Sequence, residues 1–170
     1  MPPETLFSAE QIDARVREMA REIAGSKLIP DIAMPVLVGG FVFAADLLRA
    51  LAWEGVPMDV EMIWLRSYGD KRVASAISMI AGPSEQIEGK HVLVIDGVLD
   101  AGRTVAKAVS LIQAAGAASV QVAVMLDKQR TDCIARADYV GFSVDKDHFV
   151  IGYGMDDAGR HRGLPYIGKV

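Results

Sequence analysis

Apolar residues near the N-terminus recur at the spacing of one helix face. Four of them lie three or four positions apart: Ile12, Val16, Met19 and Ile23. This spacing predicts an amphipathic helix. Ser8 and Gln11 stand just before this run, at the spacing of a capping box, in which each side chain accepts a backbone N–H of the first turn. A second helix is expected over 41–53, closed by Gly55.

Further along, short apolar segments predict strands. They span 35–38, 60–65, 73–80, 91–95 and 120–126. The segment 91–95 is almost continuously apolar, which is typical of a strand covered on both faces. A helix over about 104–115, ended by Gly116, separates it from 120–126. Strand, turn, helix and strand in this order form a βαβ unit and indicate a parallel sheet.

The predicted fold class is therefore α/β, with a central parallel sheet flanked by helices. No repeat or long linker divides the sequence, so we expect a single domain over residues 1–170. In parallel sheets of this kind, ligands bind beyond the carboxyl ends of the strands. That rule directs attention to residues 38–40, 96–104 and 127–131.

Composition narrows the classes of function. The formal net charge of −4 argues against nonspecific binding to nucleic acid or to an anionic membrane. The single cysteine, Cys133, excludes an internal disulfide and suits a reducing compartment. No apolar run reaches the roughly 18 residues that span a bilayer, and the N-terminus lacks the features of a secretory signal. We therefore expect a cytoplasmic protein with no membrane or nucleic-acid partner.

The turn from Asp96 to Thr104 carries the clearest chemistry. Its last residues, 101–104, can present backbone N–H groups to an anion at the start of a helix. Asp96 and Asp100 bracket this position, so a metal ion or sugar hydroxyl groups could lie beside a phosphate. From the residues alone, an alternative stays open in which Asp100 only caps the helix and Gly102 only eases a tight turn.

The segment 92–104 also resembles the phosphoribosyl pyrophosphate (PRPP) motif of type I phosphoribosyltransferases. Further blocks resemble the hypoxanthine-guanine branch of that family, in the same order along the chain. They are a pyrophosphate loop and helix at 36–47, the start of a mobile loop at 67–69, and a purine-binding hood and tail in 139–142, 149–156 and 162–168. The resemblance implies the type I phosphoribosyltransferase fold, with a small hood built from the N-terminal segment and residues of about 139–170.

The resemblance also implies an activity and the residues that perform it. The protein would be a glycosyltransferase of purine salvage that transfers the phosphoribosyl group of PRPP to an oxo-purine, hypoxanthine or guanine, with Mg²⁺. Asp100 would be the catalytic carboxylate. The ribose-5-phosphate part of PRPP would contact Asp96, Asp100, Ala101, Gly102, Arg103 and Thr104. Pyrophosphate would contact Val38, Gly39, Gly40, Ser67, Tyr68 and Arg162. The purine would contact Lys128, Phe149, Val150 and Asp156, and the metal Asp96 and Asp156. By the same resemblance we expect a homodimer or homotetramer.

The sequence departs from the family pattern at three positions of these motifs. Gly97 replaces the usual second acid, Ala101 replaces a threonine, and Val38 replaces a lysine found in many relatives. The hood between Phe142 and Phe149 is one residue longer than in close relatives. Because a charged hydrogen bond is worth roughly 1.5–3 kcal/mol, losing the acid predicts weakened activity. Two other interpretations stay open: a homologue that binds nucleotide or PRPP with impaired catalysis, and an enzyme for another base, such as xanthine.

Overall fold

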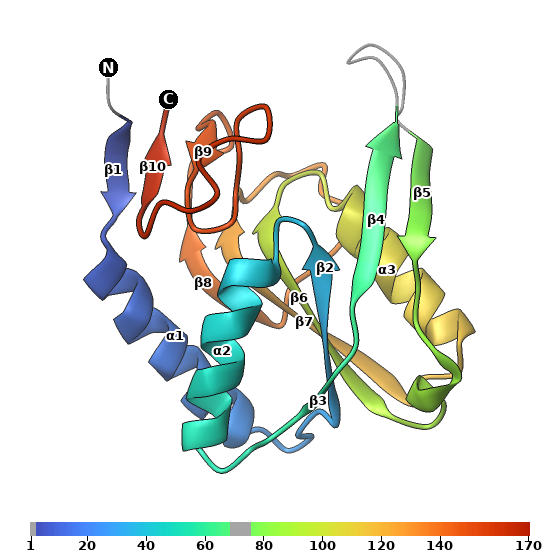
Figure 1. Ribbon diagram of the computed structural model, residues 1–170. Helices are drawn as coiled ribbons and strands as arrows, with labels where there is room; N and C mark the ends of the chain where they lie inside the picture. Colours follow the sequence, from blue (N-terminus) through green and yellow to red (C-terminus); the bar gives the residue numbers. More distant parts are fainter. Residues whose placement is uncertain (1–2, 69–75) are drawn as a thin grey trace.

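The computed structural model describes residues 3–68 and 76–170. Its main sheet has seven strands, and all neighbouring pairs are parallel except β4 and β5. Six of them follow the order β5 (Ala76–Ala81), β4 (Ile63–Tyr68), β2 (Ile32–Leu37), β6 (His91–Leu99), β7 (Ser119–Asp127) and β8 (Tyr139–Ser143), and β3 (Asp59–Val60) pairs with β2. The predicted α/β class is confirmed (Figure 1).

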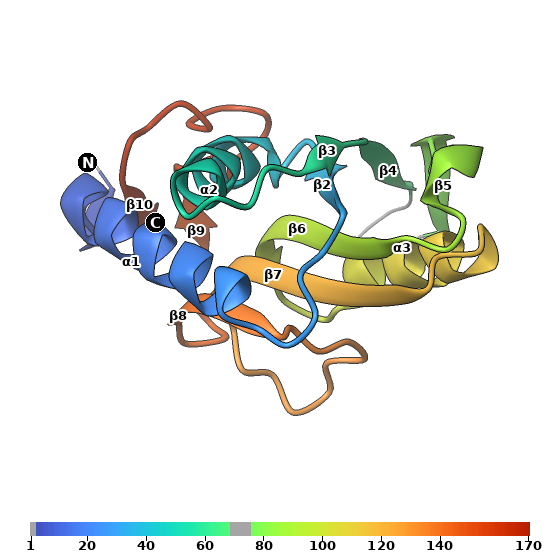
Figure 2. The same cartoon turned by 90° about the horizontal axis from the view of Figure 1, so that it is seen from below.

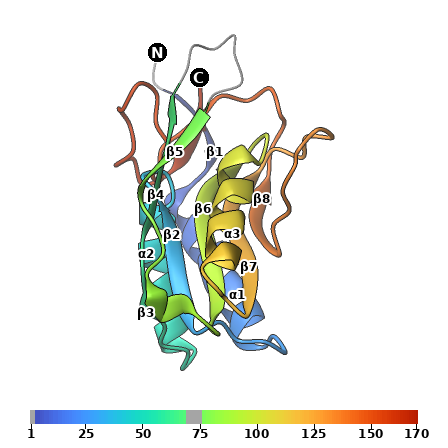
Figure 3. The ribbon, with the colours of Figure 1, turned by 90° about the vertical axis from the view of Figure 1, so that its right-hand side faces the viewer.

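Helices cover both faces of this sheet. Helices α1 (Ala9–Ala24) and α2 (Phe41–Trp53) lie on one face and α3 (Arg103–Ala114) on the other, as Figures 2 and 3 show. In β6, Leu93 and Ile95 join the core cluster under α1 and α2. Val92 and Val94 join the cluster under α3. Strand β6 is therefore buried on both faces, as its apolar sequence predicts.

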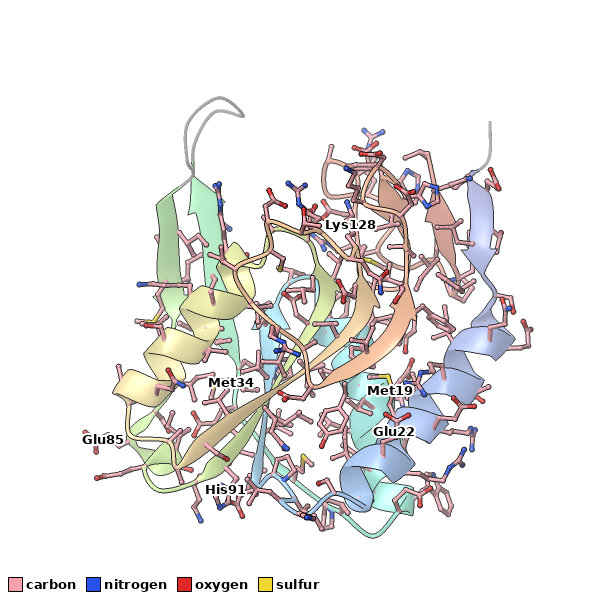
Figure 4. All side chains as sticks on the ribbon, turned by 180° about the vertical axis from the view of Figure 1, so that it is seen from behind. Met19, Glu22, Met34, Glu85, His91 and Lys128 are labelled. Carbon is pink, nitrogen blue, oxygen red and sulfur yellow. The ribbon has the colours of Figure 1, made fainter. Side chains whose placement is uncertain are left out.

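Helix α1 has both features predicted from the sequence, a capping box at its start and a buried apolar face. The Ser8 hydroxyl accepts the Gln11 N–H at 3.3 Å, and the Gln11 side chain accepts the Ser8 N–H at 2.8 Å, which completes the capping box. The four residues of the predicted apolar face are all buried, and Met19 is fully so (Figure 4). Burying this face against α2 and the sheet orders the helix, because packing supplies most of a helix's stability.

A second, smaller sheet joins the two ends of the chain. Strand β10 (Ile167–Lys169) lies between β1 (Glu4–Phe7) and β9 (Val150–Ile151), antiparallel to both. Figure 1 shows β1 and β10 side by side above α1. Ile167, Val150 and Tyr153 pack into the same core cluster as α1 and α2. The C-terminal segments are thus tied to the side of the main sheet that carries α2.

Several element boundaries differ from the predictions. Strand β6 continues to Leu99, because its register with β7 runs unbroken to the pair Leu99–Asp127. Residues 96–99 are therefore strand and not part of the predicted turn. The predicted strand 60–65 divides into β3 and β4, and β4 runs on to Tyr68. Of the predicted strand 73–80, residues 73–75 lie outside the described residues. No helix of the described ranges is long and apolar enough to cross a membrane.

Candidate active site

The strands of the main sheet lead to a cleft at their carboxyl ends. In Figure 4, His91 at the start of β6 lies at the bottom of the molecule and Lys128, just after β7, lies at the top. The cleft has a volume of about 590 Å³. Its walls come from several parts of the chain: Val36, Leu37 and Gly39, then Leu65 and Ile77, Asp96 and Val98, 100–105, Arg130, and Asp156 with Arg162. This is the position that the parallel-sheet rule predicts.

The residues after β6 form an anion cradle at the start of α3. Gly102 is the N-cap residue, with φ of +78°, and no side chain caps the helix. A Cβ atom at Gly102 would lie 2.8 Å from both the Ala135 nitrogen and the Cys133 Sγ, so the position requires glycine. The first N–H groups of α3 therefore need an outside acceptor, and an anion in the cleft can serve.

Asp100 forms two ion pairs at the edge of this cradle. Its Oδ2 accepts from the Lys128 Nζ at 3.2 Å, and its Oδ1 from the Arg130 guanidinium at 3.3 Å. The alternative in which Asp100 caps α3 is wrong, because Gly102 occupies the cap. Lys128 is largely buried and its backbone N–H donates to Leu99, which fixes the start of the loop after β7. Arg130 was not among the site residues predicted from the sequence, although it lies within the strand-end segment 127–131.

Asp96 lies at the floor of the cleft and is 8% exposed. Burial raises the pKa of this carboxyl group to about 7, while the 2.7 Å hydrogen bond from the Gly97 N–H opposes that rise. A buried carboxylate binds a proton or a cation readily, since either neutralises its charge. The predicted role of Asp96 toward metal and ribose hydroxyl groups fits this environment.

The loop after β2 rests on two glycines. A Cβ atom at Gly97 would lie 2.8 Å from the Gly39 carbonyl oxygen, and one at Gly154 would lie 2.7 Å from the same oxygen. The Gly39 carbonyl is therefore seated between β6 and the segment after β9. In this arrangement, Gly97 cannot carry the family's second acid unless the loop moves. The Gly39 carbonyl thus leaves no room for a side chain at position 97, where the sequence departs from the family pattern.

Asp156 and Arg162 close the cleft from the C-terminal side. Their side chains pair at 2.7 Å, and the Arg162 guanidinium also donates to the Gly154 carbonyl at 2.6 Å. Both residues line the same cleft as Gly39 and Asp96. Among the described residues, no group of three or more carboxylate, histidine or cysteine side chains could hold a metal ion. Any ion here would share its coordination with a ligand.

This cleft is not lined by five of the predicted site residues that the structure describes: Val38, Gly40, Lys128, Phe149 and Val150. Lys128 lines a neighbouring hollow of about 430 Å³ with Gln129 and residues 143–146. Phe149 is half exposed beside β9, and Val150 is buried within it. Val38 is exposed, and Gly40 packs tightly, since a Cβ atom there would lie 2.5 Å from the Ile95 carbonyl oxygen. Ser67 and Tyr68 end β4, where their backbones pair with Ile77 and Ala76. Their side chains, and Gly69, lie outside the described residues.

Comparisons with known proteins agree with this geometry. A family model described as the phosphoribosyl transferase domain matches residues 4–158. The hypoxanthine-guanine phosphoribosyltransferase of Bacillus subtilis is 34% identical over 96% of this chain and 90% of its own length. The bifunctional protein TilS/HprT of Listeria innocua is 36% identical over 96% of the chain, which spans 25% of that longer protein.

A solved structure gives the same result in three dimensions. The hypoxanthine phosphoribosyltransferase of Trypanosoma cruzi, in complex with the product IMP, superposes with a TM-score of 0.87. Its sequence is 34% identical, and the match covers 98% of this chain and 92% of that one. The chain belongs to the phosphoribosyltransferase family.

Proposed function

We propose that the protein transfers the phosphoribosyl group of PRPP to hypoxanthine or guanine, giving IMP or GMP and pyrophosphate. One observation carries this proposal most directly. Asp100, paired with Lys128, stands at the edge of the anion cradle of α3, in the same cleft as Asp96, Asp156 and Arg162. A phosphate, a sugar and a base can therefore lie next to one another across the carboxyl ends of β6 and β7.

In the reaction, the bond between C1 of the ribose and pyrophosphate breaks while a ring nitrogen of the purine bonds to C1. The imidazole ring of the purine loses a proton, and Asp100 would accept it. Lys128 would donate to the exocyclic oxygen of the base. Phe149 would stack on the purine and the Val150 backbone would contact its edge. Phe149, just before β9, is half exposed, whereas the next residue, Val150, is buried, and this contrast supports the division of roles.

The leaving pyrophosphate gains negative charge as its bond to C1 breaks. The backbone of residues 38–40 and the Arg162 guanidinium would hold it, since a planar guanidinium fork suits phosphate oxygens. Residues 101–104 would hold the 5-phosphate, and Asp96 would face the ribose hydroxyl groups. The contact of the Gly39 carbonyl with Gly97 and Gly154 supports a loop held in one position before substrate binds.

The donor set fits Mg²⁺ as the metal. Magnesium is usually bound through one or two protein carboxylates together with substrate phosphates, so two aspartates suffice. Asp96 and Asp156 line the same cleft, and both offer hard oxygen ligands. Bound there with PRPP, Mg²⁺ would neutralise charge that accumulates on pyrophosphate. The Asp156–Arg162 ion pair gives Arg162 a fixed position from which to reach the same phosphate oxygens.

The assay that tests this function offers the bases separately. Protein, PRPP and Mg²⁺ are incubated with hypoxanthine, guanine, xanthine or adenine, and the nucleotide product is measured. We expect product with hypoxanthine or guanine and none with adenine, because Lys128 offers donors to an exocyclic oxygen and has no acceptor for an amino group. Two outcomes contradict the proposal: product with adenine alone, or no product with any of the four bases.

Gly97, which replaces the usual second acid, favours a second candidate function: a homologue that binds nucleotide or PRPP with impaired catalysis. Restoring the acid by Gly97→Asp is the direct comparison, but its Cβ atom crowds the Gly39 carbonyl. Gly97→Ala is therefore the matched control, since it introduces the crowding without the charge. If the aspartate variant turns over faster than the alanine variant, the missing acid limits the rate. PRPP binding by the wild type without any product favours the binding homologue.

Two further properties belong to this proposal. Assembly into a homodimer or homotetramer is the expectation from the family, and light scattering measures it. Cytoplasmic localisation is the other, and the single free thiol, Cys133, suits a reducing compartment.

A further inference from the structure

Asp100 pairs with two cations, Lys128 and Arg130, and in the proposed reaction Lys128 must leave Asp100 to contact the base. Lys128 reaches Asp100 Oδ2 at 3.2 Å and Arg130 reaches Oδ1 at 3.3 Å. When a purine binds, the Lys128 ammonium must turn toward the exocyclic oxygen of the base. Asp100 then keeps its position in the cleft only if another group holds its second oxygen.

Arg130 has the geometry of such a group. Its Nε and one terminal nitrogen form a two-point contact with Asp132 at 2.9 and 2.8 Å. The other terminal nitrogen is left to face Asp100. A guanidinium is rigid and planar, so fixing one edge aims the other. Asp132 therefore orients Arg130, and Arg130 in turn holds Asp100.

The backbone around Arg130 is fixed as well. The Cys133 N–H donates to the Arg130 carbonyl at 3.3 Å, and the Ile134 N–H donates to the Ala101 carbonyl at 3.1 Å. The Cys133 Sγ also packs against Gly102, at the N-cap of α3. The loop after β7 is thereby tied to the anion cradle that starts α3. Arg130 and Asp100 are held in register by the same contacts that shape the cradle.

We propose that Arg130 is a positioning residue, which holds the Asp100 carboxylate toward the purine while Lys128 moves to the base. This inference rests on the proposed function. A direct contact of Arg130 with phosphate is the competing role, because Arg130 lines the cleft beside residues 101–104. The two-point contact with Asp132 disfavours it, since the edge that would fork a phosphate is already occupied.

The two roles predict different kinetics for Arg130→Ala. A lost positioning contact lowers kcat, whereas a lost phosphate contact raises the KM for PRPP. We expect kcat with hypoxanthine to fall by about ten-fold, the effect of one charge-assisted hydrogen bond, while the KM for PRPP changes less than about three-fold. Arg130→Lys should recover part of kcat, because an ammonium can still reach Asp100. Asp132→Ala should lower kcat in the same direction, since it releases the guanidinium.

Arg136→Ala is the matched control, because Arg136 is an exposed cation of the same loop that does not line the cleft. Urea midpoints identify a variant that fails to fold, and Arg130→Gln then replaces Arg130→Ala. A raised KM for PRPP with unchanged kcat, or equal kinetics for the alanine variants at 130 and 136, overturns the positioning role alone. No product from the wild type with any oxo-purine overturns the proposed function, and this inference with it.

Discussion

Ionisation of Asp96 should make the stability of the metal-free protein fall as pH rises. An aspartate in an unfolded chain has a pKa of about 3.9, whereas burial raises the pKa of Asp96 to about 7 in the folded protein. Between these values the folded state binds more protons than the unfolded state. The contribution of Asp96 to stability is therefore fully present below about pH 4 and is lost as pH rises toward 7.

The magnitude follows from the same pKa difference. Each pH unit within this window changes the free energy of unfolding by about 1.4 kcal/mol, so raising the pH from 5 to 8 should remove about 2–3 kcal/mol. Asp96→Asn has nearly the same shape and no charge to lose. It should therefore lack this part of the pH dependence, and the variant should gain stability relative to the wild type as pH rises.

Urea unfolding in the presence of a chelator measures this difference. Wild type and Asp96→Asn are unfolded at pH 5, 6, 7 and 8, and the difference between their free energies of unfolding is plotted against pH. Groups that titrate in both proteins cancel in that difference. A difference that stays constant from pH 5 to pH 8 refutes the reasoning, because Asp96 would then ionise as if it were exposed.

Two further predictions concern contacts around α2 and the loop that precedes it. Tyr153→Phe removes the 2.6 Å hydrogen bond to Asp46, which joins the segment after β9 to α2. The variant should lose about 1–2 kcal/mol of unfolding free energy in urea titrations, and an unchanged urea midpoint contradicts this. Gly97→Ala places a Cβ atom 2.8 Å from the Gly39 carbonyl and should destabilise the fold by about 1–3 kcal/mol and raise the KM for PRPP. Wild-type stability and KM in that variant would show that the loop moves freely.

Much of the main sheet could be predicted because its signals are local or strictly periodic. The apolar run that becomes β6 marks a strand buried on both faces, the capping box at Ser8 marks the start of α1, and Gly102 permits the left-handed turn before α3. The end of β6 could not be predicted in this way. Asp96 and Gly97 are typical of a turn, and only the pairing of β6 with β7 keeps them in the strand.

The motifs that form the candidate site could be predicted from the sequence, whereas several contacts between its residues could not. Asp96, the cradle at 101–104 and Arg162 do share one cleft. The contacts of Arg130 were not predictable, because one of its two carboxylate partners, Asp100, is distant in the sequence and meets Arg130 only after the loop after β7 has folded. The same holds for Gly97, whose contact with Gly39 joins β6 to the loop after β2, which is distant in the sequence. Contacts of this kind are products of tertiary structure.

In the proposed reaction Asp100 accepts the purine proton, whereas most of the contacts to PRPP come from other residues of the site. Single-turnover formation of IMP by wild type and Asp100→Asn, with the affinity of each for PRPP measured separately, tests it most directly. We expect the variant to bind PRPP within a few-fold of the wild type and to form IMP at least about 100-fold more slowly, the range of general-base catalysis. IMP formed at the wild-type rate by Asp100→Asn would contradict it.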